Sequence, residues 1–249
     1  MNTSKTDQTD NTAPNIQITD KRVTMLASAT DEFPRNMGGD IIRLVDGRLF
    51  LAYSQWFTGT HDDDSSRVVG QISHDNGETW SEIFPISEPQ NNGDSVRMPS
   101  LIRLSDNRLA IFVRYHLGKE KKWVAMMVCK DESQDCLNQD AWTEPTPITP
   151  DGPGGHIIIA KRVVRTNQGR IIVPIASPWP WDRKDDKTTD IRTCCMLSDD
   201  DGKTWCRSHS VLAGPERGLM EPCILELKNG NSQPKSSIIP CQPRMLFTS

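Results

Sequence analysis

Short apolar runs separated by polar turns recur along the chain. Pairs of such runs flank a turn in GDIIRLVDGRLFLAYS (39–54), PSLIRLSDNRLAIFVR (99–114) and KRVVRTNQGRIIVPIA (161–176), and a fourth segment begins EPCILELKNG (221–230). Asp-Gly or Asn-Gly between two apolar runs is typical of a tight β-hairpin. The runs favour Ile, Val, Leu and Phe and lack a 3.6-residue period, so they predict buried strands rather than helices.

The hairpins recur at a nearly constant spacing. Their aligned turn residues are separated by 60, 62 and 61 positions, and they are Gly47, Asn107, Gly169 and Gly230. Self-similarity at a fixed period of this length indicates an array in which each repeat is one supersecondary unit. The chain is therefore predicted to be all-β and built from repeated small sheets.

A second element follows the hairpins in two of the units. SHDNGETW (73–80) and SDDDGKTW (198–205) both fit the pattern S-x-D-x-G-x-T-W and lie 125 residues apart, about two periods. The unit between them carries a degenerate stretch, KDESQDCLNQDAW (130–142), which ends on the expected tryptophan. The three tryptophans, Trp80, Trp142 and Trp205, are 62 and 63 positions apart.

We expect this element to brace a hairpin rather than to take part in catalysis. Its Asp can accept backbone N–H groups inside a tight turn, and its Gly supplies the positive φ that the turn requires. Its Trp packs between sheets while the indole N–H finds a carbonyl. The structural residues are Asp75, Gly77 and Trp80 in the first copy and Asp200, Gly202 and Trp205 in the second.

Composition narrows the class of protein. The chain has 249 residues and a net charge of 29 − 33 = −4, without a block of Lys or Arg, so neither a nucleic-acid partner nor a membrane partner is indicated. The polar start of the chain lacks the apolar segment of a secretory signal, which predicts a cytoplasmic protein, with secretion by other routes left open. The seven Cys include no C-x-x-C pair, so we expect free thiols and neither a metal nor a cofactor.

S-x-D-x-G-x-T-W is the Asp-box, or bacterial neuraminidase repeat, and with it the chain resembles the sialidase (neuraminidase) superfamily over residues 31 to 230. It is most similar to bacterial sialidase-like glycoside hydrolases with an RN-x-x-GD-I-I-R-L-x-DGRL opening. The resemblance implies a six-bladed β-propeller of four-stranded blades, of which about three to four are present. We expect a disordered leader (1–22), a partial propeller (23–230) and an atypical tail (231–249) that reflects truncation or a frameshift.

The resemblance also implies a catalytic apparatus: three arginines for a substrate carboxylate, an Asp acid/base, and a Tyr nucleophile activated by a Glu. The acid/base falls in the loop FTGTHDDDSSR (57–67), where alignment selects Asp62 and leaves Asp63 and Asp64 as alternatives. Three adjacent carboxylates repel one another, so we expect the pKa of one of them to be raised. The alternative is a solvated acidic loop without a catalytic role.

Arg35, Arg97 and Arg162 are the predicted substrate-binding arginines. Arg35 lies in FPRNMGGDIIRL, although strict spacing of the family pattern would place Met37 there, and Arg97 lies in VRMPSLIRL. Arg162 is at the start of the third unit. The alternative for each is a structural ion pair at a strand end.

Glu221, in GLMEPCILELKNG, matches the family Glu that activates the nucleophilic Tyr. A phenol with a pKa near 10 needs such a base to act at neutral pH. An ion pair with a neighbouring Arg is the alternative for this Glu. The chain has only Tyr53 and Tyr115, and neither matches the nucleophile.

Two functions follow from these residues. The first is an exo-sialidase-like, retaining glycosidase that releases terminal sialic acid or a related sugar from a glycan or sialoglycoconjugate. The second is a non-catalytic propeller that binds glycans or a partner protein. The unmatched tyrosine keeps the second open, and the oligomeric state is not predicted.

Overall fold

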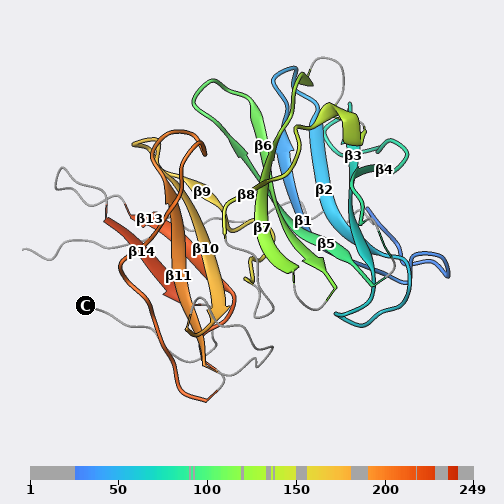
Figure 1. The fold of residues 1–249 in the computed structure, drawn as a ribbon. Coiled ribbons are helices and arrows are strands. Elements are labelled where there is room, and N and C mark those ends of the chain that lie inside the picture. The colour runs from blue at the N-terminus through green and yellow to red at the C-terminus, as the bar shows by residue number, and fades with distance from the viewer. Residues whose placement is uncertain are drawn as a thin grey trace, which may run out of the picture.

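A computed structural model describes residues 26–240, with gaps at 90, 92, 119–120, 133–135, 137, 150–155, 181–189, 217 and 228–234. The predicted leader over 1–22 lies outside the described residues, and so do residues 231–234 and 241–249 of the predicted tail. The described part is almost entirely β-structure arranged as a row of small sheets (Figure 1).

The first two sheets, here called blades one and two, are antiparallel meanders. Blade one comprises β1 (Arg35–Arg43), β2 (Leu49–Trp56), β3 (Ser66–Ser73) and β4 (Phe84–Ser87). Blade two comprises β5 (Ser95–Arg103), β6 (Leu109–Leu117), β7 (Lys121–Val128) and β8 (Thr146–Pro147), with a short 3₁₀ helix, η2 (Gln139–Ala141), before β8. A single parallel pair, Ser66 with Ser95, joins β3 to β5.

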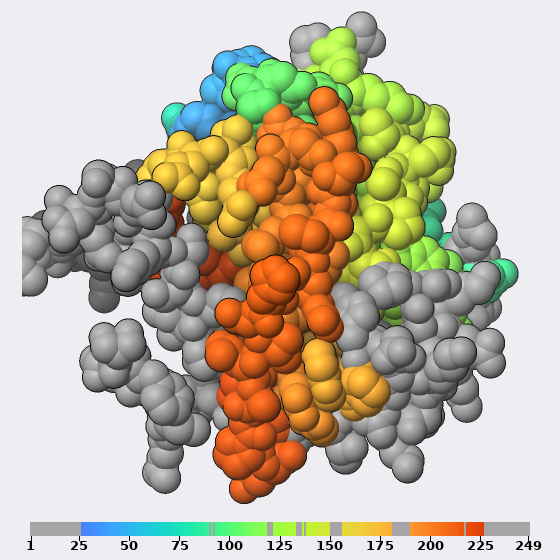
Figure 2. Space-filling view, turned by 60° about the vertical axis from the view of Figure 1, so that its left-hand side comes forward, coloured from blue at the N-terminus to red at the C-terminus, as the bar shows by residue number. Residues whose placement is uncertain are grey.

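Blade three has the strand order β12-β11-β10-β9. Its strands are β9 (Val164–Arg165), β10 (Ile171–Pro178), β11 (Ile191–Ser198) and β12 (Cys206–Arg207). A two-stranded sheet follows, in which β13 (Pro222–Leu227) pairs with β14 (Lys235–Pro240), a strand supplied by the predicted tail. In Figure 2, residues 190–216 form an orange ridge on one face, beside the yellow-green residues of blade two.

Apolar side chains are buried on both faces of blade two. Ile111 and Val113 of β6 pack with Phe50 of blade one in one cluster. Their neighbour Phe112 faces the other way and packs with Val173 of blade three in a second cluster. Alternate residues of one strand thus serve two interfaces, which explains why the strands read as continuous apolar runs.

A hydrogen bond at the hairpin end of the sheets links each blade to the next. In each case a backbone N–H in the first hairpin turn of a blade donates to a carboxylate of the following blade. The pairs are Val45 with Glu132 (3.4 Å), Ser105 with Asp201 (3.1 Å) and Asn167 with Glu226 (3.1 Å). Glu226 therefore has a structural place in the array.

The two Asp-boxes adopt the same hydrogen-bonded turn. In blade one, Asp75 accepts from the backbone N–H of Thr79 (2.9 Å) and from its hydroxyl (2.6 Å), while the Trp80 indole donates to the carbonyl of Gly77 (3.2 Å). The blade-three copy repeats these bonds at 2.9, 2.6 and 3.0 Å. Gly77 and Gly202 have φ of 92° and 85°, the left-handed backbone that this turn requires.

Of the described residues, none belongs to a helix long and apolar enough to cross a membrane.

The Asp-box carboxylates predict a pH-dependent stability. Hydrogen bonds from Thr79 lower the pKa of Asp75 from 3.8 to about 2, and those from Thr204 do the same for Asp200. A depressed carboxylate pKa stabilises the fold above the unfolded pKa and loses that contribution as the pH falls through the folded value. Asp75→Asn and Asp200→Asn should lower the melting temperature at neutral pH.

Thermal melts across a pH series measure this effect. The deficit of each variant should be constant from pH 7 to about pH 5 and shrink as the pH falls from about 4 toward 2. Asp63→Asn, outside both boxes, serves as the matched control and should melt like the parent protein. A deficit that grows on acidification contradicts the prediction.

Candidate functional site

The predicted acid/base loop, residues 57–65, connects β2 to β3 at the end of the sheets opposite the hairpin turns. The start of β1 and the end of β2 meet there, with Arg35 paired to Trp56. In blade two the start of β5 and the end of β6 meet at the same end, with Arg97 paired to Arg114. Four strand ends from two blades therefore converge on this loop.

Two of the predicted arginines hold Asp62. The Nη1 atom of Arg35 lies 2.7 Å from Oδ1 of Asp62 and donates to the carbonyl of Thr60 at 2.8 Å. Arg97 donates from Nη1 to the backbone carbonyl of Asp62. The structure thus brings Arg35, Arg97 and Asp62 together.

Trp56 forms the floor beneath these arginines. The Cζ atom of Arg35 lies 4.5 Å from the centroid of its ring, and that of Arg97 lies 6.0 Å away. A guanidinium within about 6 Å of an indole face is attracted by the ring quadrupole. Trp56 is fully buried, so it positions the two cations and does not offer a free face to a sugar.

The three consecutive aspartates have different surroundings. Asp64 accepts from the backbone N–H of His61 (2.6 Å), and its own N–H donates to the His61 carbonyl (3.1 Å), so it closes the loop turn. Asp63 is exposed and has His61 Nδ1 at 3.8 Å. Asp62 alone of the three forms an ion pair with a site arginine.

The expectation of a raised pKa does not hold for Asp62. The hydrogen bond from Arg35 lowers the pKa of this carboxyl, with further lowering from the charges of Arg35, Arg97 and His61. Attraction to these cations outweighs the repulsion expected within the acidic run. Asp62 is therefore ionised in the ligand-free site.

Arg114 is a further cation in the site. Burial lowers its pKa to about 9, and the nearby positive charge of Arg97 adds to this effect. Burial likewise lowers the pKa of Arg97, which Asp62 and Asp63 partly oppose. The Nε atoms of Arg97 and Arg114 are buried and find no hydrogen-bond partner within the described part of the chain. Three arginines therefore stand against two carboxylates, Asp62 and Asp63.

Sequence reasoning missed Arg114. It lies seven residues after the aligned turn residue of its unit, where blade one has Ser54 and blade three has Ala176. An isolated charge at the end of an otherwise apolar strand was the available signal. The motifs of the repeat pointed to arginines on the first strand of each unit, whereas Arg114 lies on the second strand of blade two, β6.

Arg162 does not join this group. It lies seven residues before its aligned turn residue, whereas Arg97 lies ten before and Arg35 twelve before, which sets Arg162 deeper along the inner side of blade three. Its backbone N–H donates to Ser100 Oγ (3.1 Å), but its side chain forms no hydrogen bond or ion pair with another described residue. Met37, the position that strict spacing favours, lies within reach of the Arg35 guanidinium, with Nη2 to Sδ at 2.8 Å.

Glu221 lies immediately before β13 and is exposed. It is nine residues before its aligned turn residue, as are Gly38 and Met98 in blades one and two. All three have a positive φ, of 56°, 61° and 60° respectively. Glu221 therefore occupies the repeat position of the bulges in β1 and β5, but it has no hydrogen bond or ion pair with Arg35, Asp62 or any other described residue.

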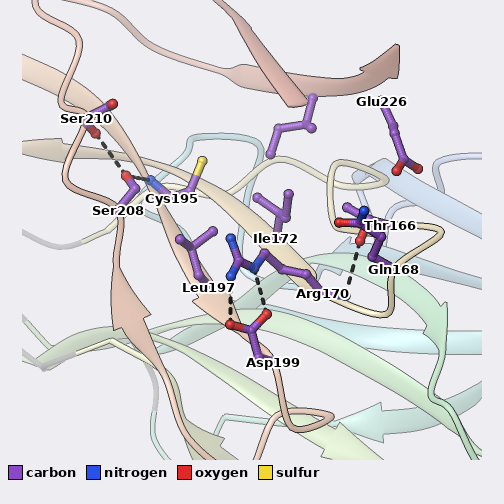
Figure 3. A pocket seen from close by; sticks show the side chains of 11 residues that line it. Thr166, Gln168, Arg170, Ile172, Cys195, Leu197, Asp199, Ser208, Ser210 and Glu226 are labelled. Atoms are coloured by element: carbon purple, nitrogen blue, oxygen red, sulfur yellow. Dashed lines mark hydrogen bonds and ion pairs between the residues drawn. The ribbon is translucent and has the colours of Figure 1, made fainter. Parts of the chain in front are cut away.

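A cavity of about 500 Å³ lies elsewhere, beside β10, β11 and β13 (Figure 3). Its most polar feature is a two-pronged pair in which Nε and Nη2 of Arg170 bond the Asp199 carboxylate at 2.6 and 2.8 Å. None of the predicted catalytic or substrate-binding residues lines it. The described residues also include no group of three or more His, Cys, Asp or Glu arranged to hold a metal ion.

The family model of the BNR repeat-like domain matches residues 29–234, which is more than half of the chain. The chain belongs to this family.

Solved structures agree with this family at the level of the fold. A Hadza microbial sialidase has a TM-score of 0.62 at 14% identity, over 80% of this chain and 41% of that one. A Trypanosoma rangeli sialidase bound to 2,3-difluorosialic acid as a covalent intermediate gives 0.59 at 16% identity, over 79% and 33%. A Dyadobacter fermentans protein of unknown function gives 0.58 at 19% identity, over 80% and 60%.

These likenesses establish the fold as a partial sialidase-type β-propeller whose sheets do not close into a ring. The chain spans between a third and three fifths of the length of these three structures. No match was found among functionally curated proteins.

His116 reports on the charge of the site. Burial, followed by the positive charges of Lys122, Arg114 and Arg97, lowers its pKa to about 4, so it should stay neutral through pH 5. Removing one of these charges in Arg114→Gln should raise the pKa of His116, because less repulsion then opposes its protonation. NMR titration of the imidazole signals measures both values.

Arg162→Gln is the matched control, because Arg162 lies outside the group and should leave the titration unchanged. An unaltered His116 pKa in Arg114→Gln would show that the two side chains do not share one electrostatic environment.

Proposed function

We propose that this chain carries the substrate-binding part of a sialidase-like glycoside hydrolase that acts on terminal sialic acid, or a related acidic sugar, of glycoconjugates. The observation that carries the proposal is the group formed by Arg35, Arg97 and Arg114 beside the carboxylate of Asp62. Membership in the BNR repeat-like domain family and the fold shared with sialidases support the same class of reaction.

The charge balance of this group favours an anionic ligand. Burying a guanidinium is costly unless it is paired, and the Nε atoms of Arg97 and Arg114 have no partner among the described residues. The planar guanidinium fork matches a carboxylate, which it binds through two parallel hydrogen bonds. A sugar acid supplies such a group.

Binding of a carboxylate changes the state of Asp62. An incoming carboxylate competes with Asp62 for Arg35, and the exposed Arg35–Asp62 pair contributes only about 0–1 kcal/mol, so its loss costs little. Once Asp62 loses the hydrogen bond from Arg35, the main influence that lowers its pKa is removed. The carboxyl then takes up a proton more readily and can serve as the general acid toward the leaving-group oxygen.

A binding function without turnover is the second candidate. The chain has two tyrosines, and both are buried within strands, Tyr53 at 4% and Tyr115 at 6% exposure. Burial raises the pKa of Tyr53 to about 12, and the hydroxyl of Tyr115 is hydrogen-bonded to Ser87 (2.8 Å). Neither phenol is placed to act as a nucleophile beside Asp62.

Arg35→Ala should weaken the binding of free N-acetylneuraminic acid by about tenfold or more, since a charge-assisted pair with the carboxylate is lost. Arg162→Ala is the matched control. Arg162 also lies near the start of its unit but outside the arginine group, so this variant should bind like the parent. Calorimetry or ligand-observed NMR gives the affinities. Equal losses in both variants, or none in either, contradict the assignment.

Hydrolysis of a fluorogenic sialoside tests the catalytic part. Asp62→Asn should lose turnover by a factor of about 10² or more, because the amide cannot donate the proton. The same variant should bind the free sugar at least as well as the parent, because Arg35 no longer pairs with a carboxylate at position 62. Glu221→Gln should also lose turnover, and Asp63→Asn should retain it.

Two outcomes separate the candidates. Sugar binding without turnover in the parent protein supports the binding function. Equal turnover in Asp62→Asn, Glu221→Gln and the parent removes both residues from the catalytic site.

A further inference from the structure

Blade two lacks the Ser-Asp pair that braces the other blades. In blades one and three, Ser73 and Ser198 pair with the first residue of β2 and β10 respectively. In blade two the backbone N–H of Cys129 donates to the carbonyl of the first residue of β6 (2.8 Å). Cys129 therefore occupies the position of the Asp-box serine.

The end of the turn is equivalent as well. The N–H of Thr143 donates to the carbonyl of Val128 (2.9 Å), as the N–H of Ser81 donates to that of Ile72 (2.8 Å). Trp142 thus stands where blade one has Trp80. Seven positions separate Ser73 from Trp80, and thirteen separate Cys129 from Trp142. Blade two must therefore hold a turn six residues longer, without the Asp and Gly of the motif.

A second sulfur lies against the first within this long turn. The Sγ atoms of Cys129 and Cys136 are 2.7 Å apart, close to the separation of Ser73 Oγ and Asp75 Oδ1, which is 2.8 Å. Both cysteines are buried, at 2% and 0% exposure. The two sulfurs need to approach by less than about 1 Å to reach the bond length of a disulfide, about 2.05 Å.

We propose that Cys129 and Cys136 form a disulfide bond that braces the long turn of blade two in place of an Asp-box. The bond forms by exchange with a small disulfide such as oxidised glutathione, which reaches the buried pair during local opening of the fold. The thiolate of Cys129 attacks one glutathione sulfur, which forms a mixed disulfide and releases one glutathione thiolate. The Cys136 sulfur then attacks the Cys129 sulfur, which releases the second glutathione. Two protein thiols are oxidised, two glutathione sulfurs are reduced, and the two thiol protons pass to the released glutathiones.

The electrostatics of the pair agree with this order of events. The hydrogen bond with Cys136 lowers the pKa of Cys129, whereas the same bond and burial raise that of Cys136. The thiolate is the attacking species, so Cys129 reacts first.

The other described cysteines are placed differently. Cys194 and Cys195 are adjacent on β11, so their side chains leave opposite faces of the sheet and cannot meet. Burial raises the pKa of these two thiols to about 11 and about 12. Cys206 is exposed on β12, and Cys223 is half-buried on β13.

Tryptic peptide mapping tests the bond directly, because Lys130 lies between the two cysteines. Cleavage after Lys122, Lys130 and Lys161 places Cys129 in residues 123–130 and Cys136 in residues 131–161. After equilibration with oxidised glutathione, these peptides should appear as one linked species under non-reducing conditions and as two after reduction. The linked species should be absent from Cys136→Ser and present in the matched control Cys194→Ser.

A second measurement follows stability. The oxidised parent should melt about 5 °C or more above the reduced protein, since the bond closes a short loop in the unfolded chain, and Cys136→Ser should melt at one temperature with or without reductant. Seven titratable thiols in the denatured parent after oxidation, or a link between another pair, overturns the proposal. The peptide map of the parent decides the matter even where a serine variant folds poorly.

Discussion

Blade two buries apolar side chains on both of its faces, and a single sheet cannot do so alone. β6 shows the constraint most clearly, because Ile111 and Val113 contact blade one while Phe112 contacts blade three. Stability in such an array is a sum over neighbouring pairs of sheets. The polar links at the hairpin turns depend on this packing, since they only form when successive blades are held at a fixed spacing.

The candidate functional site, at the opposite end of the sheets, depends on the same spacing between blades. Because blades one and two stand side by side, strand ends that are about sixty residues apart in sequence present Arg35 and Arg97 to one loop. The buried indole of Trp56 and the carboxylate of Asp62 make this concentration of positive charge tolerable. The site is therefore a property of the interface between two blades, and its electrostatics are set by how closely they pack.

The repeat allowed the hairpins, the Asp-boxes and the all-β array to be predicted, because turn chemistry and apolar alternation act locally. It located Arg35, Arg97 and Asp62 through the resemblance that it carried. It did not reveal Arg114, whose relevance depends on β6 lying beside β5, or the lowered pKa of Asp62, which depends on where Arg35 points. The repeat predicts that Arg162 lies with the other arginines. It is, however, three positions closer to its aligned turn residue than Arg97 is, and its side chain does not join the group. The Cys129–Cys136 contact could not be predicted, because blade two has no Asp-box from which to align its turn with those of blades one and three.

The hairpin links give the array a direction. Blades two and three each donate a backbone N–H forward and receive one from behind on a carboxylate, so their leading and trailing faces differ in chemistry. Contacts of this head-to-tail kind generate rings when the rotation closes and open-ended assemblies when it does not. A blade therefore fits into the array in one orientation only, and a reversed sheet would place carboxylate against carboxylate and leave amide groups facing one another.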